Sequence, residues 1–127
     1  MPVPLDDPTV SDDERLWRRV GPSQIITNPE TGESRPSSAV FRSTNEISVA
    51  RASLTTPAAT LENYPKHSLV EFEARVARLA GCIVVCDPLS GDRAHALVYG
   101  SGANGRLTKT QAKKIAGQAR WVRFQAP

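Results

Sequence analysis

Short runs of apolar residues, separated by polar and turn-forming residues, divide the chain into predicted strands and helices. Residues 82–86 and 94–99 are two such runs with a short polar turn between them, a pattern that predicts a β-hairpin. Similar runs predict short extended segments at the following positions: 24–27, 35–42, 46–49 and 121–124. Residues 14–20, closed by Gly21-Pro22, fit either a short strand or a turn of helix.

Two capping-box sequences mark the starts of the principal predicted helices. The first is Ser68–Glu71, and apolar residues at helical spacing continue from it to Gly81, whose position predicts a left-handed C-terminal cap. The second is Thr108–Gln111, which predicts a helix through about Ala119. These elements predict an α+β fold, in which residues 14–127 form a single compact domain with a small antiparallel or mixed sheet and two main helices.

The first 13 residues hold three prolines and four aspartates, which predicts an extended acidic arm. This terminus lacks the basic and apolar regions of a signal peptide, and no apolar run approaches the roughly 20 residues of a membrane-spanning helix. Hydrophobic residues make up 39% and charged residues 23% of the chain, an ordinary globular balance that argues against wholesale disorder. We therefore expect a soluble, cytoplasmic protein with no membrane partner.

The two cysteines, Cys82 and Cys86, lie in one predicted strand. Residues four apart in a strand share a face but are about 13 Å apart at a rise of about 3.3 Å per residue, which is too far for a disulfide. With no histidine or third cysteine nearby they do not form a zinc site. We expect two small buried apolar side chains in a reducing compartment, and neither a metal nor a cofactor.

Charge is distributed unevenly along the chain. Residues 1–63 carry six arginines against nine acidic residues, a net charge of −3, whereas residues 64–127 carry ten basic residues against four acidic ones, a net charge of +6. No acidic residue follows Asp92, and the last 22 residues contain six basic ones: Arg106, Lys109, Lys113, Lys114, Arg120 and Arg123. Such a segment attracts phosphate-rich partners, although a solvated helix face is the alternative interpretation.

A glycine-rich loop, Gly100–Gly105, separates the last predicted hairpin from the basic helix. It satisfies the pattern G-x-G-x-x-G, in which the glycines allow backbone N–H groups to approach a phosphate. Gly102 and Gly105, with Arg106 and Lys109 close by, are therefore candidate phosphate ligands. A dinucleotide-binding fold is not expected, because no acidic residue follows to hold a ribose; a flexible connection is the alternative.

A second candidate chemistry involves His95, Arg35 and the adjacent Ser37 and Ser38. A guanidinium beside two hydroxyl groups can hold an anion, and a histidine in a strand can act as general acid or base if it opens onto a cleft. The alternatives are structural: a hydrogen-bonded core histidine, and serines that stabilise the entry to a strand.

Several segments occur in the same order as in a group of small bacterial proteins that have no assigned activity. They are LWRRV from Leu16, RPSSAVF from Arg35, ISV from Ile47, Asp87-Pro88, AHALVYG from Ala94 and ARWV from Ala119. From Leu16 onward the chain resembles that group, which implies a bacterial, stand-alone, intracellular module. The resemblance supplies no mechanism.

Three function classes follow from these features. The first is a binding module that contacts nucleic acid or another polyanion through the basic segment. The second is a small enzyme acting on a nucleotide or phosphoester, with His95 as acid or base and the Arg35–Ser38 segment as anion site. The third is a protein-interaction or regulatory module of a bacterial operon, whose acidic arm and basic tail contact different partners or pair between chains. The oligomeric state is open.

Overall fold

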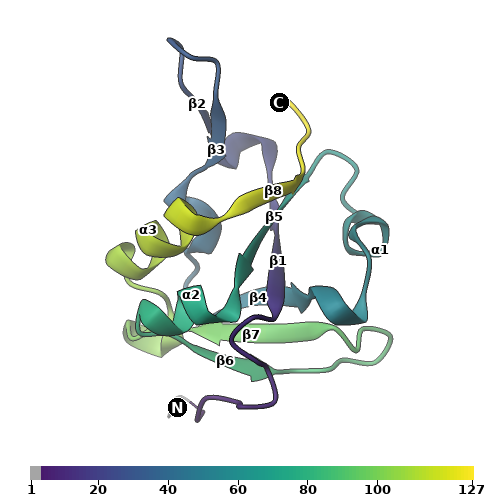
Figure 1. The fold of residues 1–127 in the computed structure, drawn as a ribbon, viewed down its shortest axis with the longest axis vertical. Coiled ribbons are helices and arrows are strands. Elements are labelled where there is room, and N and C mark those ends of the chain that lie inside the picture. Colours follow the sequence, from purple (N-terminus) through teal and green to yellow (C-terminus); the bar gives the residue numbers. More distant parts are fainter. Residues whose placement is uncertain (1–3) are drawn as a thin grey trace.

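The computed structural model describes residues 4–127 and contains a six-stranded antiparallel sheet in the order β6-β7-β4-β1-β5-β8 (Figure 1). The strands of this sheet are β1 (Arg15–Val20), β4 (Ile47–Arg51), β5 (Ser68–Glu73), β6 (Ile83–Cys86), β7 (His95–Tyr99) and β8 (Arg120–Arg123). Strands β2 (Ile25–Thr27) and β3 (Ser34–Pro36) form a separate hairpin that projects from one end of the molecule. The α-helices within residues 4–127 are α1 (Pro57–Leu61), α2 (Ala74–Leu79) and α3 (Lys109–Gln118).

This architecture confirms the predicted α+β class. Strands β6 and β7 pair as an antiparallel hairpin, with Val84 opposite Val98, as their two apolar runs indicate. Helix α3 begins where the second capping box predicts: the Thr108 hydroxyl accepts the N–H of Gln111 at 3.1 Å, and the Gln111 side chain accepts the N–H of Thr108 at 3.0 Å. Gly81 has the predicted left-handed conformation, with φ of 94°. No helix in the part of the chain that the structure describes is long and apolar enough to cross a membrane.

The predicted helix start at Ser68 is wrong, because Ser68–Glu73 is strand β5 and helix α2 begins only at Ala74. Strand β5 lies between β1 and β8 and pairs with β1 along its whole length. Its apolar residues, Leu69, Val70 and Phe72, are buried on both faces of the strand, and their spacing neither alternates strictly nor excludes a helix, so the local pattern fits both elements. The Ser68 hydroxyl does not cap a helix; it accepts the N–H of Gln125 at 2.8 Å.

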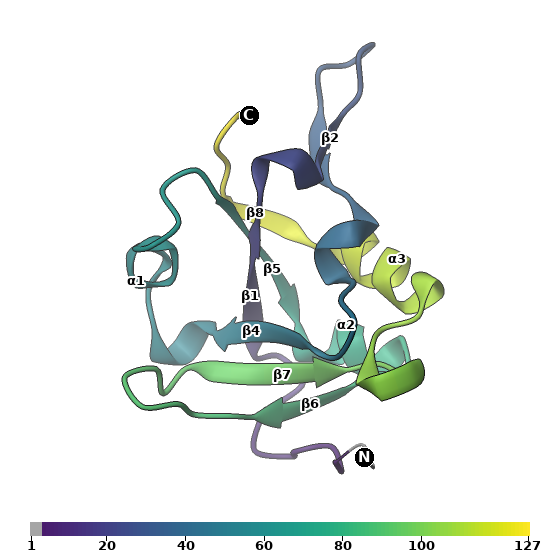
Figure 2. The same cartoon turned by 180° about the vertical axis from the view of Figure 1, so that it is seen from behind.

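The core lies between one face of the sheet and three covering elements: helices α2 and α3 and the 3-10 helix η2 (Ser38–Phe41). Phe41 and Phe72 form its aromatic centre, with ring centroids 5.6 Å apart in an edge-to-face arrangement. Ala112 and Ile115 anchor α3 to this core, which leaves the opposite side of the helix to solvent. Helix α1 lies on the other side of β1 and β5 (Figures 1 and 2).

The acidic segment from residue 4 to residue 13 does not extend away from the domain, whereas residues 1–3 of the predicted arm lie outside the described residues. The Asp7 N–H donates to the carbonyl of Val84 on edge strand β6 at 2.9 Å. Arg78 of α2 bonds Asp12 at 2.8 Å and Asp6 at 3.2 Å, and Val10 is fully buried. Asp6, Asp7 and Asp12 therefore attach the segment to β6 and α2. Because these carboxylates already have partners within the domain, they are less available to another molecule than they would be on an extended arm.

Asp7 is expected to make this attachment sensitive to pH. Hydrogen bonds from the Thr9 hydroxyl and N–H, and from the Cys86 N–H, lower the pKa of Asp7 to about 2. Because the folded-state pKa is below the usual 3.8, the stabilisation is present above about pH 4 and is lost as the pH falls toward 2. Asp7→Asn should lower the unfolding free energy at pH 7 by about 1 kcal/mol, a value reduced for solvent screening of this accessible carboxylate.

Urea unfolding at several pH values between 7 and 2.5 tests this. The difference between wild type and Asp7→Asn should shrink steadily below about pH 4, because the unfolded chain then takes up a proton that Asp7 in the folded protein, with a pKa of about 2, still resists. Glu30→Gln, in the exposed β2–β3 turn, is the matched control and should show no such difference at any pH. A difference between wild type and Asp7→Asn that stays constant over the whole range would contradict the assignment.

Candidate functional site

The six basic side chains that follow the glycine-rich loop are all exposed. Helix α3 orients three of them, because burial of its apolar side fixes which residues face solvent. Lys109 and Lys113 are one helical turn apart, and Lys114 follows directly on the exposed side of the helix. Arg106 precedes the helix by three residues. We refer to Arg106, Lys109, Lys113 and Lys114 together as the α3 basic surface.

The basic side chains of the α3 basic surface form no ion pair with any carboxylate of the described residues. The arginine–carboxylate ion pairs among residues 4–127 are Arg15–Glu71, Arg51–Glu14, Arg75–Glu73, Arg78–Asp6 and Arg78–Asp12. All of them lie outside the segment from residue 106 to residue 123. Because the ends of exposed lysine side chains stay hydrated and mobile, they can meet phosphate groups without breaking an internal contact.

Arg120 and Arg123 do not belong to the same surface. Arg120, at the start of β8, pairs in register with Glu71 and lines a surface hollow of about 300 Å³ together with Asp13 and Glu73. The nearby carboxylates reduce the positive potential at Arg120. Arg123 lies at the other end of the strand, opposite Leu69. Glu73 also lines a hollow with Lys113 and Lys114, but its carboxylate forms an ion pair with Arg75 at 3.5 Å. The structure thus divides the basic segment into a group on α3, whose one neighbouring carboxylate in that hollow is already paired, and a group on β8 that faces several carboxylates.

The glycine-rich loop is closed by its own hydrogen bonds. The N–H of Gly100 donates to the Gly105 carbonyl at 2.7 Å, that of Gly102 to the Arg106 carbonyl at 2.9 Å, and that of Gly105 to the Gly102 carbonyl at 3.2 Å. Gly105 has a φ of +78°, and a Cβ there would lie 2.7 Å from the Tyr99 ring. Turn geometry and close packing therefore account for these glycines, which argues against the phosphate role expected for Gly102 and Gly105.

The second predicted constellation is not assembled in one place. Arg35 lies on β3 and lines a hollow formed by the β2–β3 hairpin, whereas His95 lies on β7 and lines a different hollow. Figures 1 and 2 show that hairpin at the opposite end of the molecule from β7. Ser37 is the N-cap residue of η2, and its backbone N–H donates to the carbonyl of Gln24. Ser38 is the first residue of η2. The enzyme hypothesis therefore lacks the cleft that it requires.

His95 has an acidic partner on the neighbouring turn. Its Nδ1 is 2.9 Å from the Asp87 carboxylate and 3.1 Å from the Asp87 carbonyl oxygen. Because both neighbours are hydrogen-bond acceptors, Nδ1 is the ring nitrogen that donates hydrogen bonds to Asp87, and Nε2 takes no part in these contacts. The half-buried imidazole is thereby held in a defined orientation.

The hollow beside His95 arises where the sheet splits. Strand β1 pairs with β4 only at Leu16–Arg51 and Trp17–Ala50, and the two strands then diverge. Arg18 fills the gap: its Nε donates to the Val40 carbonyl at 3.0 Å and its Nη1 to the Ser48 carbonyl at 2.8 Å. These bonds satisfy carbonyl groups near the split, where β1 no longer pairs with β4.

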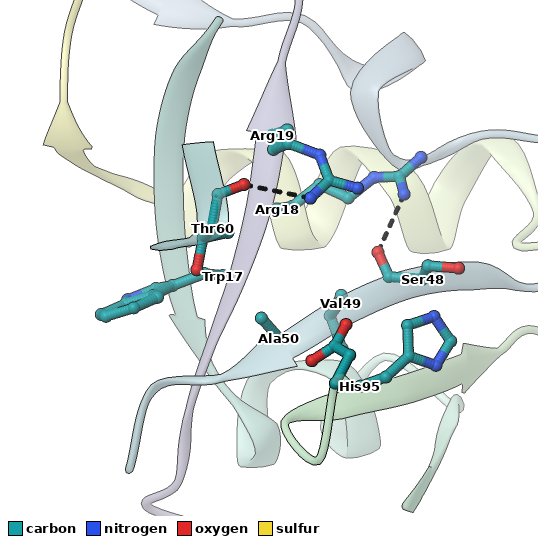
Figure 3. A pocket seen from close by; sticks show the side chains of 9 residues that line it. Trp17, Arg18, Arg19, Ser48, Val49, Ala50, Thr60 and His95 are labelled. Carbon is teal, nitrogen blue, oxygen red and sulfur yellow. Dashed lines mark hydrogen bonds between the residues drawn. The ribbon is translucent and has the colours of Figure 1, made fainter. Parts of the chain in front are cut away.

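Arg19 forms the other side of the same hollow (Figure 3). Its Nη1 donates to the Thr60 carbonyl of α1 at 3.2 Å, and its guanidinium lies 3.9 Å from the centre of the Tyr64 ring. The hollow has a volume of about 40 Å³, and its polar lining consists of Arg18, Arg19, Ser48, Thr60, Asp92 and His95. Burial lowers the pKa of the Arg18 guanidinium, and the charge of Arg19 lowers it further.

Of the residues that line this hollow, the predicted site included His95 alone, but the sequence pattern also contains a signal at Arg18. In β1, Leu16, Arg18 and Val20 share one face of the strand, so a charged residue stands between two buried apolar ones. Such a position requires polar partners inside the fold. The divergence of β1 from β4, which supplies those partners, depends on long-range pairing that periodicity does not reveal.

The cysteines are free thiols in the structure. Cys82 is buried, and burial raises its pKa to about 11, so it is a poor nucleophile. Cys86 accepts a hydrogen bond from Arg51 Nη1 at 3.2 Å.

Comparison of this chain with models of protein families, with curated proteins and with solved structures gives no match to any of them. The functional argument therefore rests on the geometry and charge of the chain alone.

Proposed function

We propose that this protein is a binding module that contacts nucleic acid, or another polyanion, through the α3 basic surface. One observation carries the proposal: four exposed basic side chains follow one another on and just before α3 and form no ion pair within residues 4–127, whereas four arginines elsewhere are paired with carboxylates. Lysine and arginine side chains in such a group release counterions when they meet a phosphate backbone, which favours binding at low salt.

The proposed contact is to the backbone and does not read the base sequence. The ammonium groups of the lysines on the exposed side of α3 can each meet a phosphate of the nucleic-acid backbone. They lack the planar, two-pronged donor geometry that an arginine uses to recognise the edge of a base. Trp121 is not a free stacking platform either, because its ring is half-buried and its Nε1–H donates to the Ser34 carbonyl at 3.0 Å. Phe124, beside Trp121, is 46% exposed and is the more accessible ring of this pair for stacking on a base.

The salt dependence of binding tests this proposal. Fluorescence anisotropy with a labelled 20-base-pair DNA duplex should show the Kd rising roughly 40- to 150-fold between 50 and 200 mM NaCl, as three or four phosphate contacts require. Lys113→Glu with Lys114→Glu should weaken binding at 50 mM NaCl at least about tenfold. The double variant should also lower the slope of log Kd against log salt by about two.

Lys66→Glu with Arg93→Glu is the matched control, because it changes the net charge by the same amount at exposed positions outside α3. This control should retain most of the affinity. An equal loss in the control would assign binding to overall charge and overturn the role of α3. Binding of heparin without DNA or RNA would identify another polyanion, and absence of binding to all three at 50 mM NaCl would refute the proposal.

A further inference from the structure

We propose that the hollow between β1 and β4 is a binding site for a phosphoryl group, either free phosphate or the phosphate end of a small molecule, held by Arg18 and Arg19. This site shares no residue with the α3 basic surface, and the inference is independent of the function proposed above. It rests on the arrangement of the two guanidinium groups, on the remaining hydrogen-bond donors and on the size of the hollow.

The two guanidinium groups form a concentrated positive charge, and no carboxylate of the described residues lies within ion-pair distance of them, although Asp92 lines the same hollow. Figure 3 shows them next to one another above Ser48 and His95. Two adjacent like charges in a partly desolvated place are unfavourable, and an anion between them relieves that cost.

Donors remain available after the internal hydrogen bonds are made. A guanidinium has five N–H groups, and the bonds described above use two of them on Arg18 and one on Arg19. These contacts also fix the orientation of both guanidinium groups. Arg18 is held by two backbone carbonyl groups, and Arg19 is held by the Thr60 carbonyl and the Tyr64 ring. Preorganised forks of this kind suit the oxygens of a phosphate.

The size of the hollow limits the ligand. A volume of about 40 Å³ holds only a few water-sized atoms. That is enough for the oxygens of a phosphoryl group, whereas a base or a sugar must remain outside. His95 and Ser48 line the wall and add polar side chains beside the proposed anion position, and Asp87 holds the imidazole in place through Nδ1.

Asp92 provides a specific way to test the site. Asp92, on the turn between β6 and β7, lines the same hollow, but its carboxylate forms no ion pair with either arginine among the described residues. An anion in the hollow is repelled by that charge, so Asp92→Asn should tighten phosphate binding about three- to tenfold. A surface that bound phosphate elsewhere would not respond to this substitution.

The experiment measures the Tm of the full chain in a phosphate-free buffer, with increasing inorganic phosphate or glycerol phosphate at constant ionic strength. The Tm should rise by roughly 5 °C at about ten times the Kd. Arg19→Gln should abolish the rise, whereas Arg35→Gln, an exposed arginine on β3, and Lys113→Glu with Lys114→Glu should retain it. A rise with inorganic phosphate alone shows a closed site, and a rise with both compounds shows a site open to phosphate esters.

Two results would overturn the inference. The first is no rise with either compound beyond that of sodium chloride at equal ionic strength. The second is a rise that Arg19→Gln leaves unchanged. If Arg19→Gln does not fold, Asp92→Asn decides the question, because an unchanged Kd in that variant places the phosphate outside the hollow.

Discussion

Gly100→Ala is expected to lower the unfolding free energy by about 3 kcal/mol or more, or to prevent folding at 37 °C. A Cβ at this position would lie 2.2 Å from Leu107 Cα and 2.4 Å from the Arg106 carbonyl oxygen. Both are backbone atoms, so no side-chain rotation can relieve the overlap. The end of β7 and the segment that leads into α3 would have to separate, and this would disturb Leu107, which is fully buried.

Gly117→Ala is the matched control for this prediction. Gly117 is exposed within α3, and a Cβ there would have no heavy atom within 4 Å. The same substitution should therefore stabilise the protein by about 0.5 to 1 kcal/mol, because alanine favours the helix and restricts the unfolded chain. Urea denaturation of both variants measures the two effects, and a loss below about 1 kcal/mol in Gly100→Ala would contradict the predicted overlap.

The glycine-rich loop shows why one pattern supports two interpretations. The spacing G-x-G-x-x-G indicates only that the backbone closely approaches another group, which can be a ligand or another part of the chain. Here Gly100 approaches the chain at Leu107, and Gly105 approaches the Tyr99 ring. A phosphate would require the same absence of side chains. The hydrogen bonds that close the loop distinguish the two cases, and they depend on where the chain returns after Arg106.

Local sequence signals predict those elements whose partners are close in the chain. The β6–β7 hairpin and the capped start of α3 belong to this class, because a turn or a capping box is complete within a few residues. The false helix start at Ser68 belongs to the other class. Its capping-box pattern is local, but β5 is determined by pairing with β1, about 50 residues earlier in the chain.

The two candidate sites differ in the same way. The exposure of Lys109, Lys113 and Lys114 follows from helical periodicity, so a basic surface on α3 can be predicted once the helix is predicted. The hollow at Arg18 and Arg19 cannot be predicted in this way, because it exists only where β1 and β4 diverge. The same geometry leaves His95 on the six-stranded sheet with Asp87 and the arginine pair, whereas Arg35 lies on the separate β2–β3 hairpin.

Phe41→Ala is expected to lower the unfolding free energy by about 3 to 5 kcal/mol. Phe41 is fully buried on η2, and its ring meets the edge of Phe72 on β5. Removing the ring leaves a cavity between the sheet and η2, and α3 packs on η2. We therefore expect α3 to lose part of its support, so the α3 basic surface should become less ordered before the sheet unfolds.

Phe124→Ala is the control, because it removes the same atoms from a side chain that is 46% exposed. This substitution should lower the unfolding free energy by less than about 1 kcal/mol. The loss comes chiefly from the contact with the Trp121 ring, whose centroid is 4.9 Å from that of Phe124. Denaturant unfolding gives both free energies, and amide hydrogen exchange in α3 reports its local order. Similar costs for the two variants, or unchanged exchange in α3 of Phe41→Ala, would show that η2 does not support the helix.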